Sequence, residues 1–266
     1  MALDDVLASG VRLNAISGLQ GSGKSTLAAQ LAAAAPARGV RAVALSIDDF
    51  YLDRGARLAL AREVHPLLAT RGPPGTHDLA LAFHTLDMLL EGRATALPRF
   101  DKLADRRLPP REWPHVEAVD LVLLEGWFLG TPPEDDAALA RPVNALERDE
   151  DRDGRWRRWC NAALAREYAP LWRRCDRLLL LRAPSFEIVP EWRWQAERAM
   201  QAADPTRDAM DRAGIARFVQ HYERVSRQAL RTLPELADVV VALDERRRPL
   251  SVSRRRTSPA GSPATR

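Results

Sequence analysis

The fold is decided by one stretch of the sequence, Gly18 to Thr26, which reads GLQGSGKST. It follows directly on the β-like segment Val11 to Ser17 and opens the Ala- and Leu-rich segment Ser25 to Ala35. A predicted strand, a glycine-rich turn and a predicted helix in this order are the setting in which the spacing G-x-x-x-x-G-K-[ST] forms a P-loop. Glycine is needed because such a loop turns its backbone N–H groups inward around an anion, at dihedral angles that other residues tolerate poorly.

The P-loop predicts that the chain binds a nucleotide. The ammonium of Lys24 would reach the β- and γ-phosphates as a point charge, and the hydroxyl of Ser25 would hold Mg²⁺. A chance glycine-rich turn is the alternative, but the spacing and both flanking segments agree with a P-loop. The residues assigned to nucleotide binding are Gly18, Gln20, Gly21, Ser22, Gly23, Lys24, Ser25 and Thr26.

Strand-like and helix-like segments alternate along the chain. Five segments have β character, most of them as the continuous apolar runs that are typical of strands covered on both faces: Val11 to Ser17, Arg41 to Ser46, Val119 to Leu124, Arg177 to Leu181 and Asp238 to Leu243. Helical spacing is clearest at Ser25 to Ala35, Leu79 to Leu90, Trp156 to Leu171, Phe186 to Gln201 and Arg212 to Arg231. This interleaving predicts an α/β protein with the P-loop NTPase fold, in which a parallel five-stranded sheet is sandwiched between helices.

Charge divides the 266 residues into two parts. Residues 245 to 266 hold seven arginines and one acid, a net charge of +6, whereas the whole chain carries +4. The part before residue 245 therefore has no basic excess, which disfavours nucleic acid as a partner. The sequence predicts a P-loop domain over residues 1 to 244 and an Arg-rich disordered tail over residues 245 to 266.

Composition also predicts the compartment. No apolar run approaches the ~18 residues that would span a bilayer, and the N-terminal segment carries acid where a signal peptide would be basic. Cys160 and Cys175 belong to no Cys-x-x-Cys pattern, which leaves a disulfide framework or a cysteine zinc site with little support. We expect a cytoplasmic monomer or homodimer without a membrane partner.

Two predicted strands end in carboxylates, and ligands of parallel α/β sheets sit beyond such strand ends. Asp48 and Asp49 follow the second predicted strand, and Glu125 follows the third. Asp48 is expected to remove or orient the proton of an attacking hydroxyl. Asp49 would help it or contact Mg²⁺ through water, and Glu125 would hold the metal or a metal-bound water. A strand-end turn or a helix cap is the alternative for either aspartate.

With these motifs in this order, the sequence resembles the D-glycerate 3-kinase family, within the P-loop kinases of small metabolites that include uridine kinase, phosphoribulokinase and pantothenate kinase. The resemblance runs through most of residues 1 to 244. Besides the P-loop, the matching stretches are SIDDFYL (Ser46 to Leu52), RGPPGTHDL (Arg71 to Leu79), PRFDK (Pro98 to Lys102), Asp105-Arg106, EGWFLG (Glu125 to Gly130) and EWRWQAERAM (Glu191 to Met200).

The resemblance implies an ATP- and Mg²⁺-dependent kinase that transfers the γ-phosphoryl group to D-glycerate and gives 3-phosphoglycerate. It implies that Asp48 is the catalytic base and that Arg193 and Arg198 lie on a helical lid. There the two guanidinium groups, with Lys24, would stabilise charge on the transferred group. A solvated, salt-bridged helix is the alternative for the two arginines.

A pocket for glycerate needs at least one cation and several hydrogen-bonding groups. The residues expected to bind the acceptor, most of them in the irregular loops over Asp53 to Asp78 and Leu97 to Pro114, are Asp48, Tyr51, Arg71, His77, Asp78, Lys102 and Arg106. Asp78 would take a hydroxyl, and Lys102 or Arg106 would face the carboxylate, although each could equally cap a turn or pair with an acid. Two departures from the family pattern touch this pocket: a short loop after Lys102, and Phe100-Asp101 in place of Tyr-Asn.

Two other functions stay open at this stage. A kinase of another small hydroxylated metabolite or of a nucleoside would share the P-loop and differ in the acceptor loops. A nucleotide-binding regulatory module would retain ATP without an acceptor, and it would have no need of Asp48 or of the lid arginines.

Overall fold

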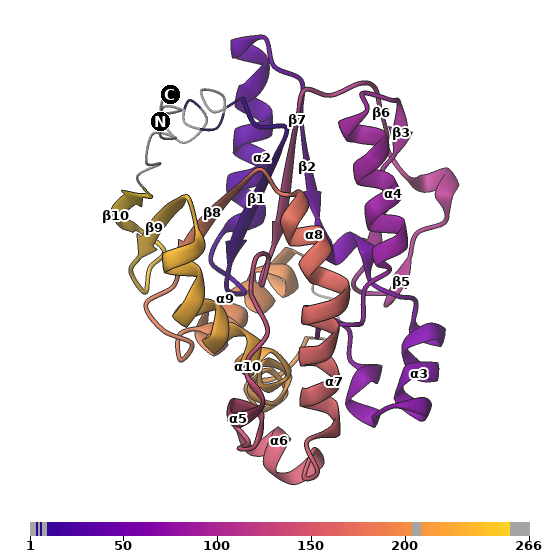
Figure 1. Ribbon diagram of the computed structural model, residues 1–266, viewed down its shortest axis with the longest axis vertical. Helices are drawn as coiled ribbons and strands as arrows, with labels where there is room; N and C mark the ends of the chain where they lie inside the picture. The colour runs from indigo at the N-terminus through magenta and orange to yellow at the C-terminus, as the bar shows by residue number, and fades with distance from the viewer. Residues whose placement is uncertain (1–3, 5, 7–9, 204–208, 256–266) are drawn as a thin grey trace, which may run out of the picture.

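The computed structural model describes residues 4, 6, 10–203 and 209–255 (Figure 1). In this part of the chain, six strands form a central sheet in the order β10 (Pro249–Arg254), β9 (Val239–Leu243), β8 (Arg177–Arg182), β1 (Leu13–Gly18), β7 (Leu121–Gly126) and β2 (Ala42–Ser46). β10 pairs antiparallel with β9, and every other pair is parallel. The predicted α/β fold with five parallel strands is confirmed, and one antiparallel strand is added at the edge.

Helices cover both faces of this sheet. In the described residues they are α2 (Lys24–Ala34), α3 (Arg54–Glu63), α4 (Leu79–Leu90), α5 (Asp136–Leu139), α6 (Ala145–Glu150), α7 (Arg155–Ala163), α8 (Ala169–Arg174), α9 (Val189–Ala203) and α10 (Arg212–Leu236). The predicted helical segments correspond to α2, α4, α9, α10 and the pair α7 and α8, which a π-helical turn joins. The sequence does not predict α5 and α6, because four and six residues are too short for a helical period to be recognised.

The strands of the sheet alternate their side chains between two hydrophobic cores. In β7, Val122 and Leu124 belong to the core that α4 covers, whereas Leu121 and Leu123 belong to the core that α2 and α9 cover. This is why the parallel strands are recognisable as continuous apolar runs. α10 reaches both cores and thereby joins the two layers of helices at one end of the sheet.

The segment after Asp244 is ordered as far as residue 255, so the prediction of a disordered tail is wrong for this part. Pro249–Arg254 forms β10, and the N–H of Arg255 donates to the carbonyl oxygen of Asp238 at 2.9 Å. Every β10 residue is exposed, so its composition resembles that of a disordered segment. Backbone pairing with the edge strand β9 requires no apolar side chains. Residues 256–266, the rest of the predicted tail, lie outside the described residues.

The order of the strands determines where a ligand binds. β1 lies between β8 and β7, and the chain leaves this centre towards both edges of the sheet. Ligands of open α/β sheets bind at such a switch point, beyond the carboxyl ends of the strands. Figure 1 shows the sheet in one half of the molecule and α3, α5, α6 and α7 in the other.

Two short ladders lie in or beside the predicted irregular loop over residues 97–114: β3 (Thr95–Ala96) pairs with β6 (His115–Val116), and β4 (Phe100–Asp101) pairs with β5 (Arg106–Arg107). Among the described helices, none is long and apolar enough to cross a membrane.

Candidate active site

The P-loop joins the end of β1 to the start of α2, and close contacts explain its glycines. Gly21 and Gly23 have φ angles of 79° and 95°, in the left-handed region that glycine adopts most easily. A Cβ atom on Gly18 would lie 2.7 Å from the carbonyl oxygen of Leu181, and one on Gly21 would lie 2.7 Å from the Cβ of Trp192. The loop therefore needs glycine both for its backbone conformation and because β8 and α9 pack against it.

Lys24 begins α2, and its ammonium is buried inside the loop. Its Nζ donates to the carbonyl oxygen of Leu19 at 3.1 Å. Burial lowers the pKa of Lys24, while the neighbouring Glu125 and Asp48 act in the opposite direction. A buried ammonium that is held by a neutral carbonyl, at a helix N-terminus, is well placed to bind an incoming phosphate.

Ser25 and Glu125 place two oxygen atoms side by side next to the loop. The Oγ of Ser25 donates to Oε1 of Glu125 at 2.8 Å, and this bond joins α2 to the end of β7. Hydroxyl and carboxylate oxygens are the ligands that Mg²⁺ prefers. These two oxygen ligands fit the predicted magnesium site.

Asp49 does not join this pair. Its Oδ1 accepts the N–H of Phe100 at 3.2 Å, and its Oδ2 lies 3.1 Å from Nη1 of Arg99. Burial raises the pKa of Asp49, against the effect of Arg99. The carboxylate of Asp49 thus anchors the segment that contains β4, and its predicted water-mediated contact with Mg²⁺ stays a prediction.

Asp48 lies in a 3₁₀ turn that follows β2, and both of its carboxylate oxygens have partners. Oδ1 accepts the O–H of Tyr51 at 2.8 Å, and Oδ2 lies 2.6 Å from Nζ of Lys102. Burial raises the pKa of Asp48, but Lys102 and Tyr51 together outweigh burial and lower the pKa to about 2. Asp48 is therefore ionised at neutral pH and oriented by two neighbours.

A cavity of about 220 Å³ brings most of the predicted catalytic and acceptor residues together. Ten residues predicted from the sequence line it, together with three that were not predicted, Trp127, Phe218 and Tyr222. The ten are Gln20, Gly21, Lys24, Ser25, Asp48, Tyr51, Arg71, Lys102, Glu125 and Arg193. P-loop, strand-end acids and acceptor residues thus meet around one space.

Several buried polar atoms of these lining residues have no hydrogen-bond partner. They are Nε of Arg193, Nε1 of Trp127 and both amide atoms of Gln20. Buried polar atoms in folded proteins nearly always have a partner, so a cluster of exceptions around one cavity indicates a place for a polar ligand or water.

Positive charge predominates around the cavity. Nη1 of Arg71 pairs with Asp105 at 2.6 Å, and the same carboxylate pairs with the buried Arg57, which fixes the position of Arg71. The guanidinium of Arg193 lies 5.7 Å from the centre of the Phe218 ring. Four cationic residues line the cavity and only two acids do. This balance favours anionic ligands.

His77 and Asp78 do not line this cavity and instead support its wall. Nδ1 of His77 lies 2.6 Å from the hydroxyl of Tyr168, and its ring centre is 4.8 Å from that of Tyr51. Burial lowers the pKa of His77 to about 4, so this side chain is neutral at pH 7. Asp78 caps the N-terminus of α4 and pairs with Arg107 at 3.0 Å.

Arg106 and Arg198 are exposed and also lie outside the lining of the cavity. The neighbouring Arg107 instead pairs with Asp78, because successive side chains of a strand face opposite sides, and it does not line the cavity either. Arg198 is five positions after Arg193, which is about 140° around a helix of 3.6 residues per turn. Of the two predicted lid arginines, the structure brings Arg193 alone to the cavity.

The three unpredicted lining residues are aromatic and resemble core residues in sequence. Phe218 and Tyr222 are four positions apart on α10, which is the spacing of a packed helix face. The hydroxyl of Tyr222 donates to the carbonyl oxygen of Arg71 at 2.8 Å. Trp127 follows Glu125 in the stretch EGWFLG, and this proximity to a site acid is the only signal in the sequence that pointed to it.

A second cavity, of about 430 Å³, borders the P-loop from another side. Its walls are the P-loop and α2 residues Gly21, Gly23, Lys24, Ser25 and Thr26, together with Gln195 and Ala196 of α9 and Arg247 of the β9–β10 turn. The two cavities share Gly21, Lys24 and Ser25. A nucleotide whose phosphates lie on the loop therefore has room for its remaining part on the side away from Asp48.

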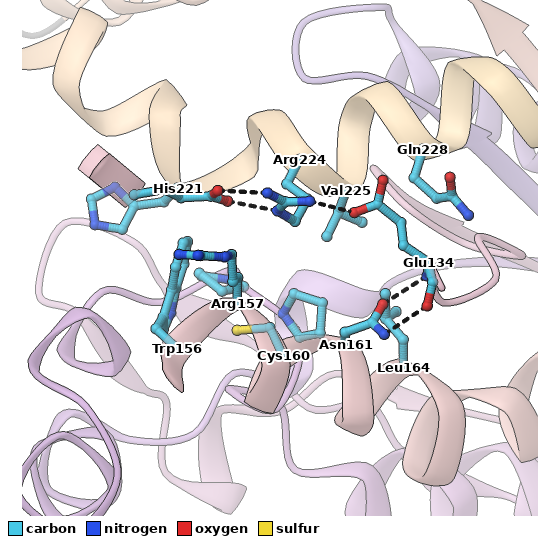
Figure 2. A pocket seen from close by; sticks show the side chains of 13 residues that line it. Glu134, Trp156, Arg157, Cys160, Asn161, Leu164, His221, Arg224, Val225 and Gln228 are labelled. Carbon is cyan, nitrogen blue, oxygen red and sulfur yellow. Dashed lines mark hydrogen bonds and ion pairs between the residues drawn. The ribbon is translucent and has the colours of Figure 1, made fainter. Parts of the chain in front are cut away.

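A third cavity lies between α7 and α10 and takes no part in this site (Figure 2). Its free volume of about 20 Å³ is no larger than a single water molecule needs. Arg224 crosses it and pairs with Glu147 at 2.7 Å and with Glu134 at 2.8 Å (Figure 2). These buried ion pairs hold α10, and hence Phe218 and Tyr222, in place.

Comparisons with known proteins agree with this geometry. The chain is 33% identical over 224 residues to the uncharacterized kinase mug58 of Schizosaccharomyces pombe, which covers 78% of this chain and 76% of that protein. It is 30% identical over 251 residues to the chloroplastic D-glycerate 3-kinase of Arabidopsis thaliana, covering 87% of this chain and 52% of the relative, so it spans about half of that protein.

The fold is shared with a solved D-glycerate 3-kinase from Cryptococcus neoformans, with a TM-score of 0.78, 24% identity and coverage of 95% of this chain and 96% of the other. No protein-family model matches this chain. The identity to the fission-yeast kinase over three quarters of both proteins, together with the P-loop and its surrounding acids, identifies the family. The chain belongs to the P-loop kinases that include D-glycerate 3-kinase.

Proposed function

We propose that this kinase transfers the γ-phosphoryl group of ATP to a hydroxyl of a small acidic metabolite, and that this acceptor is D-glycerate, giving 3-phosphoglycerate. One observation carries the proposal: the ionised carboxylate of Asp48 and the P-loop ammonium of Lys24 line the same cavity. Phosphoryl transfer to an alcohol requires a proton acceptor and a phosphate-binding group that face the same cavity. The names of the Arabidopsis and Cryptococcus relatives support glycerate as the acceptor.

The size and charge of the cavity support a small acidic acceptor. Pockets for drug-sized ligands have volumes of about 300–1,000 Å³. The volume here is about 220 Å³, and residues that would hold the γ-phosphate occupy part of the wall. Arg71, Lys102 and Arg193 supply the cations that a carboxylate needs. A nucleoside lacks this negative charge and is larger.

Asp48 would act by accepting a hydrogen bond from the attacking hydroxyl. With a pKa of about 2 it is a weak base, which suits a loose transition state in which the proton leaves late. Its two neighbours, Tyr51 and Lys102, fix the direction of the carboxylate, and burial raises the pKa of Tyr51 so that this hydroxyl stays protonated and donates. Positioning, rather than proton affinity, is then the main contribution of Asp48.

Lys24 and Arg193 would stabilise the charge of the transferred group, from the P-loop side and from α9 respectively. Ser25 and Glu125 would hold Mg²⁺, which when bound neutralises phosphate charge. Cytoplasmic location, the absence of a nucleic-acid partner and a monomeric or homodimeric state stay predictions.

The test is ADP release from MgATP with a panel of acceptors: D-glycerate, L-glycerate, glycerol, uridine and pantothenate. We expect D-glycerate to give the highest kcat/KM, and glycerol, which has the hydroxyls without the carboxylate, to be poor. Preference for uridine would contradict the acceptor assignment. Tight ATP binding with no acceptor-dependent ADP release would contradict catalysis and indicate a regulatory module.

A further inference from the structure

The turn between β9 and β10 presents one arginine to the P-loop. Asp244 accepts the N–H groups of Arg246 and Arg248, each at 2.8 Å, which closes the turn. Arg247, between them, has a φ of 63°, in the left-handed region that residues other than glycine seldom adopt. This conformation directs Arg247 inward, whereas Arg246 and Arg248 are exposed.

The guanidinium of Arg247 connects two other parts of the molecule. Its Nε donates to the carbonyl oxygen of Gly21 in the P-loop at 2.5 Å. Its Nη1 donates to Oε1 of Gln195 at 2.9 Å, and its Cζ lies 5.1 Å from the centre of the Trp192 ring. Both of these residues lie on α9. Three segments that are distant in sequence thus meet at one side chain.

The bond to Gly21 has a consequence for the interior of the loop. In a planar trans peptide the C=O and the following N–H point in opposite directions. The carbonyl of Gly21 points outward to Arg247, and the N–H of Ser22 accordingly points into the loop, where it donates to Leu19 at 3.1 Å. The same carbonyl of Leu19 accepts the ammonium of Lys24. Arg247 therefore fixes a peptide unit that belongs to the network around Lys24.

The outward direction of this carbonyl also matters electrostatically. A carbonyl oxygen turned toward a phosphate would repel it, whereas inward N–H groups attract it. Arg247 keeps the Gly21 oxygen engaged on the outside and adds a positive charge to the wall of the 430 Å³ cavity.

We propose that Arg247 is a positioning residue for nucleotide binding, which holds the Gly21 peptide of the P-loop in its phosphate-binding orientation and ties the loop to α9. This role rests on the proposed function to the extent that the P-loop must bind ATP. The composition of the β9–β10 hairpin resembles that of a disordered segment, but this role of Arg247 makes the hairpin part of the active site.

The test compares Arg247→Ala and Arg247→Lys with Arg246→Ala, a matched control from the same turn whose side chain is exposed. Calorimetry with MgATP and with MgADP, without an acceptor, measures nucleotide affinity directly. We expect the Kd of Arg247→Ala to rise about tenfold, as is typical for the loss of hydrogen bonds from a charged group. Arg247→Lys should be intermediate, because an ammonium can bind the Gly21 carbonyl but cannot also span to Gln195.

Steady-state kinetics separate positioning from a general structural defect. The KM for ATP should rise in Arg247→Ala while the KM for the acceptor stays within twofold, and the thermal midpoint should match that of Arg246→Ala. An ATP affinity of Arg247→Ala equal to that of Arg246→Ala, or an equal rise in both KM values, would overturn the proposal. Failure of the wild-type chain to bind MgATP would overturn the proposed function itself and this role with it.

Discussion

At the scale of single residues, the centre of the site is a carboxylate whose ionised form is stabilised by two neighbouring side chains. Asp48 accepts a hydrogen bond from Tyr51 and pairs with Lys102, and both contacts leave the side chain next to Lys24 in one cavity. Arg71 is fixed in turn by Asp105 and Arg57. The geometry of the site is thus set by charged pairs rather than by apolar packing alone.

Replacement of the carboxylate tests this arrangement. In Asp48→Asn the side chain keeps its size but no longer accepts a proton, so kcat should fall by about 10²–10⁴. The Kd for MgATP should stay within twofold, because Asp48 is not among the residues around the second cavity. The matched control is Asp49→Asn, which alters a carboxylate bound to Arg99 and should retain most turnover. A larger loss in the control than in Asp48→Asn would contradict the assignment.

The pH dependence of the reaction follows from the pKa of Asp48. Because this pKa is lowered to about 2, protonation of Asp48 should not limit kcat/KM above about pH 4, and the stability that the ionised group contributes is lost only as pH falls from about 4 to about 2. In Lys102→Met, burial still raises the pKa of Asp48, but the cation that does most to lower this pKa is gone. The acidic limb of the kcat/KM profile should therefore move to higher pH, and an unchanged limb would contradict the role of Lys102.

The sequence predicts residue types at this site better than residue positions. It places Asp48, Lys24 and Glu125 correctly at the switch point, because strand ends and a P-loop are local patterns. It names Arg106 as an acceptor residue and not Arg107, because neighbouring residues of a strand differ only in the direction of their side chains, which the tertiary packing decides.

At the scale of elements, α9 and the P-loop are in direct contact at Gly21. The Cβ position of Gly21 lies 2.7 Å from Trp192 Cβ, and Arg247 binds the carbonyl oxygen of the same glycine. α9 also supplies Arg193 to the acceptor cavity. A substitution at Gly21 that displaces the loop from Trp192 is therefore expected to weaken nucleotide binding.

A glycine substitution tests this contact. Gly21→Ala adds a methyl group against Trp192 at a φ of 79°, and the displaced loop should weaken MgATP binding by about tenfold or more. Gly39→Ala is the matched control, because Gly39 has a similar φ of 72° but no atom within 4 Å of its Cβ position. Both variants should lose stability through backbone strain, and calorimetry should detect weaker ATP binding in Gly21→Ala alone.

Elements with a strong local pattern are the ones that the sequence predicts. α4 has the predicted bounds Leu79–Leu90, and the five parallel strands agree within a few residues. β10 is missed because its two large apolar residues, Leu250 and Val252, are exposed among Pro, Ser and Arg, and because its pairing depends on the edge that β9 offers. The π-helical turn at Leu164–Tyr168 is also invisible in a pattern that fits one continuous helix.

At the scale of the whole molecule, buried charge joins α10 to the other elements of the helical half. The side chains of Arg224 and Glu147 are 8% and 0% exposed, and the guanidinium joins α10 to α6 and to the loop that carries Glu134 (Figure 2). No local sequence pattern predicts this pairing, because its members are about 80 residues apart.

Truncation of this arginine should destabilise the fold. Arg224→Ala leaves Glu147 buried and unpaired, and the free energy of unfolding should fall by about 3–5 kcal/mol. Arg217 lies on the same helix as Arg224 and makes an exposed pair with Glu150 of α6, so Arg217→Ala should change the free energy of unfolding by only about 0–1 kcal/mol. Urea unfolding measures both, and equal effects would contradict the anchoring role of Arg224.

The most direct measurement of the central claim is ³¹P NMR of the wild-type chain with MgATP and D-glycerate, beside Asp48→Asn. The account predicts that ATP signals are replaced by those of ADP and 3-phosphoglycerate in equal amounts, and that the variant forms almost no product while it still binds ATP. Conversion of ATP to ADP and inorganic phosphate alone, or equal product from both proteins, would contradict it.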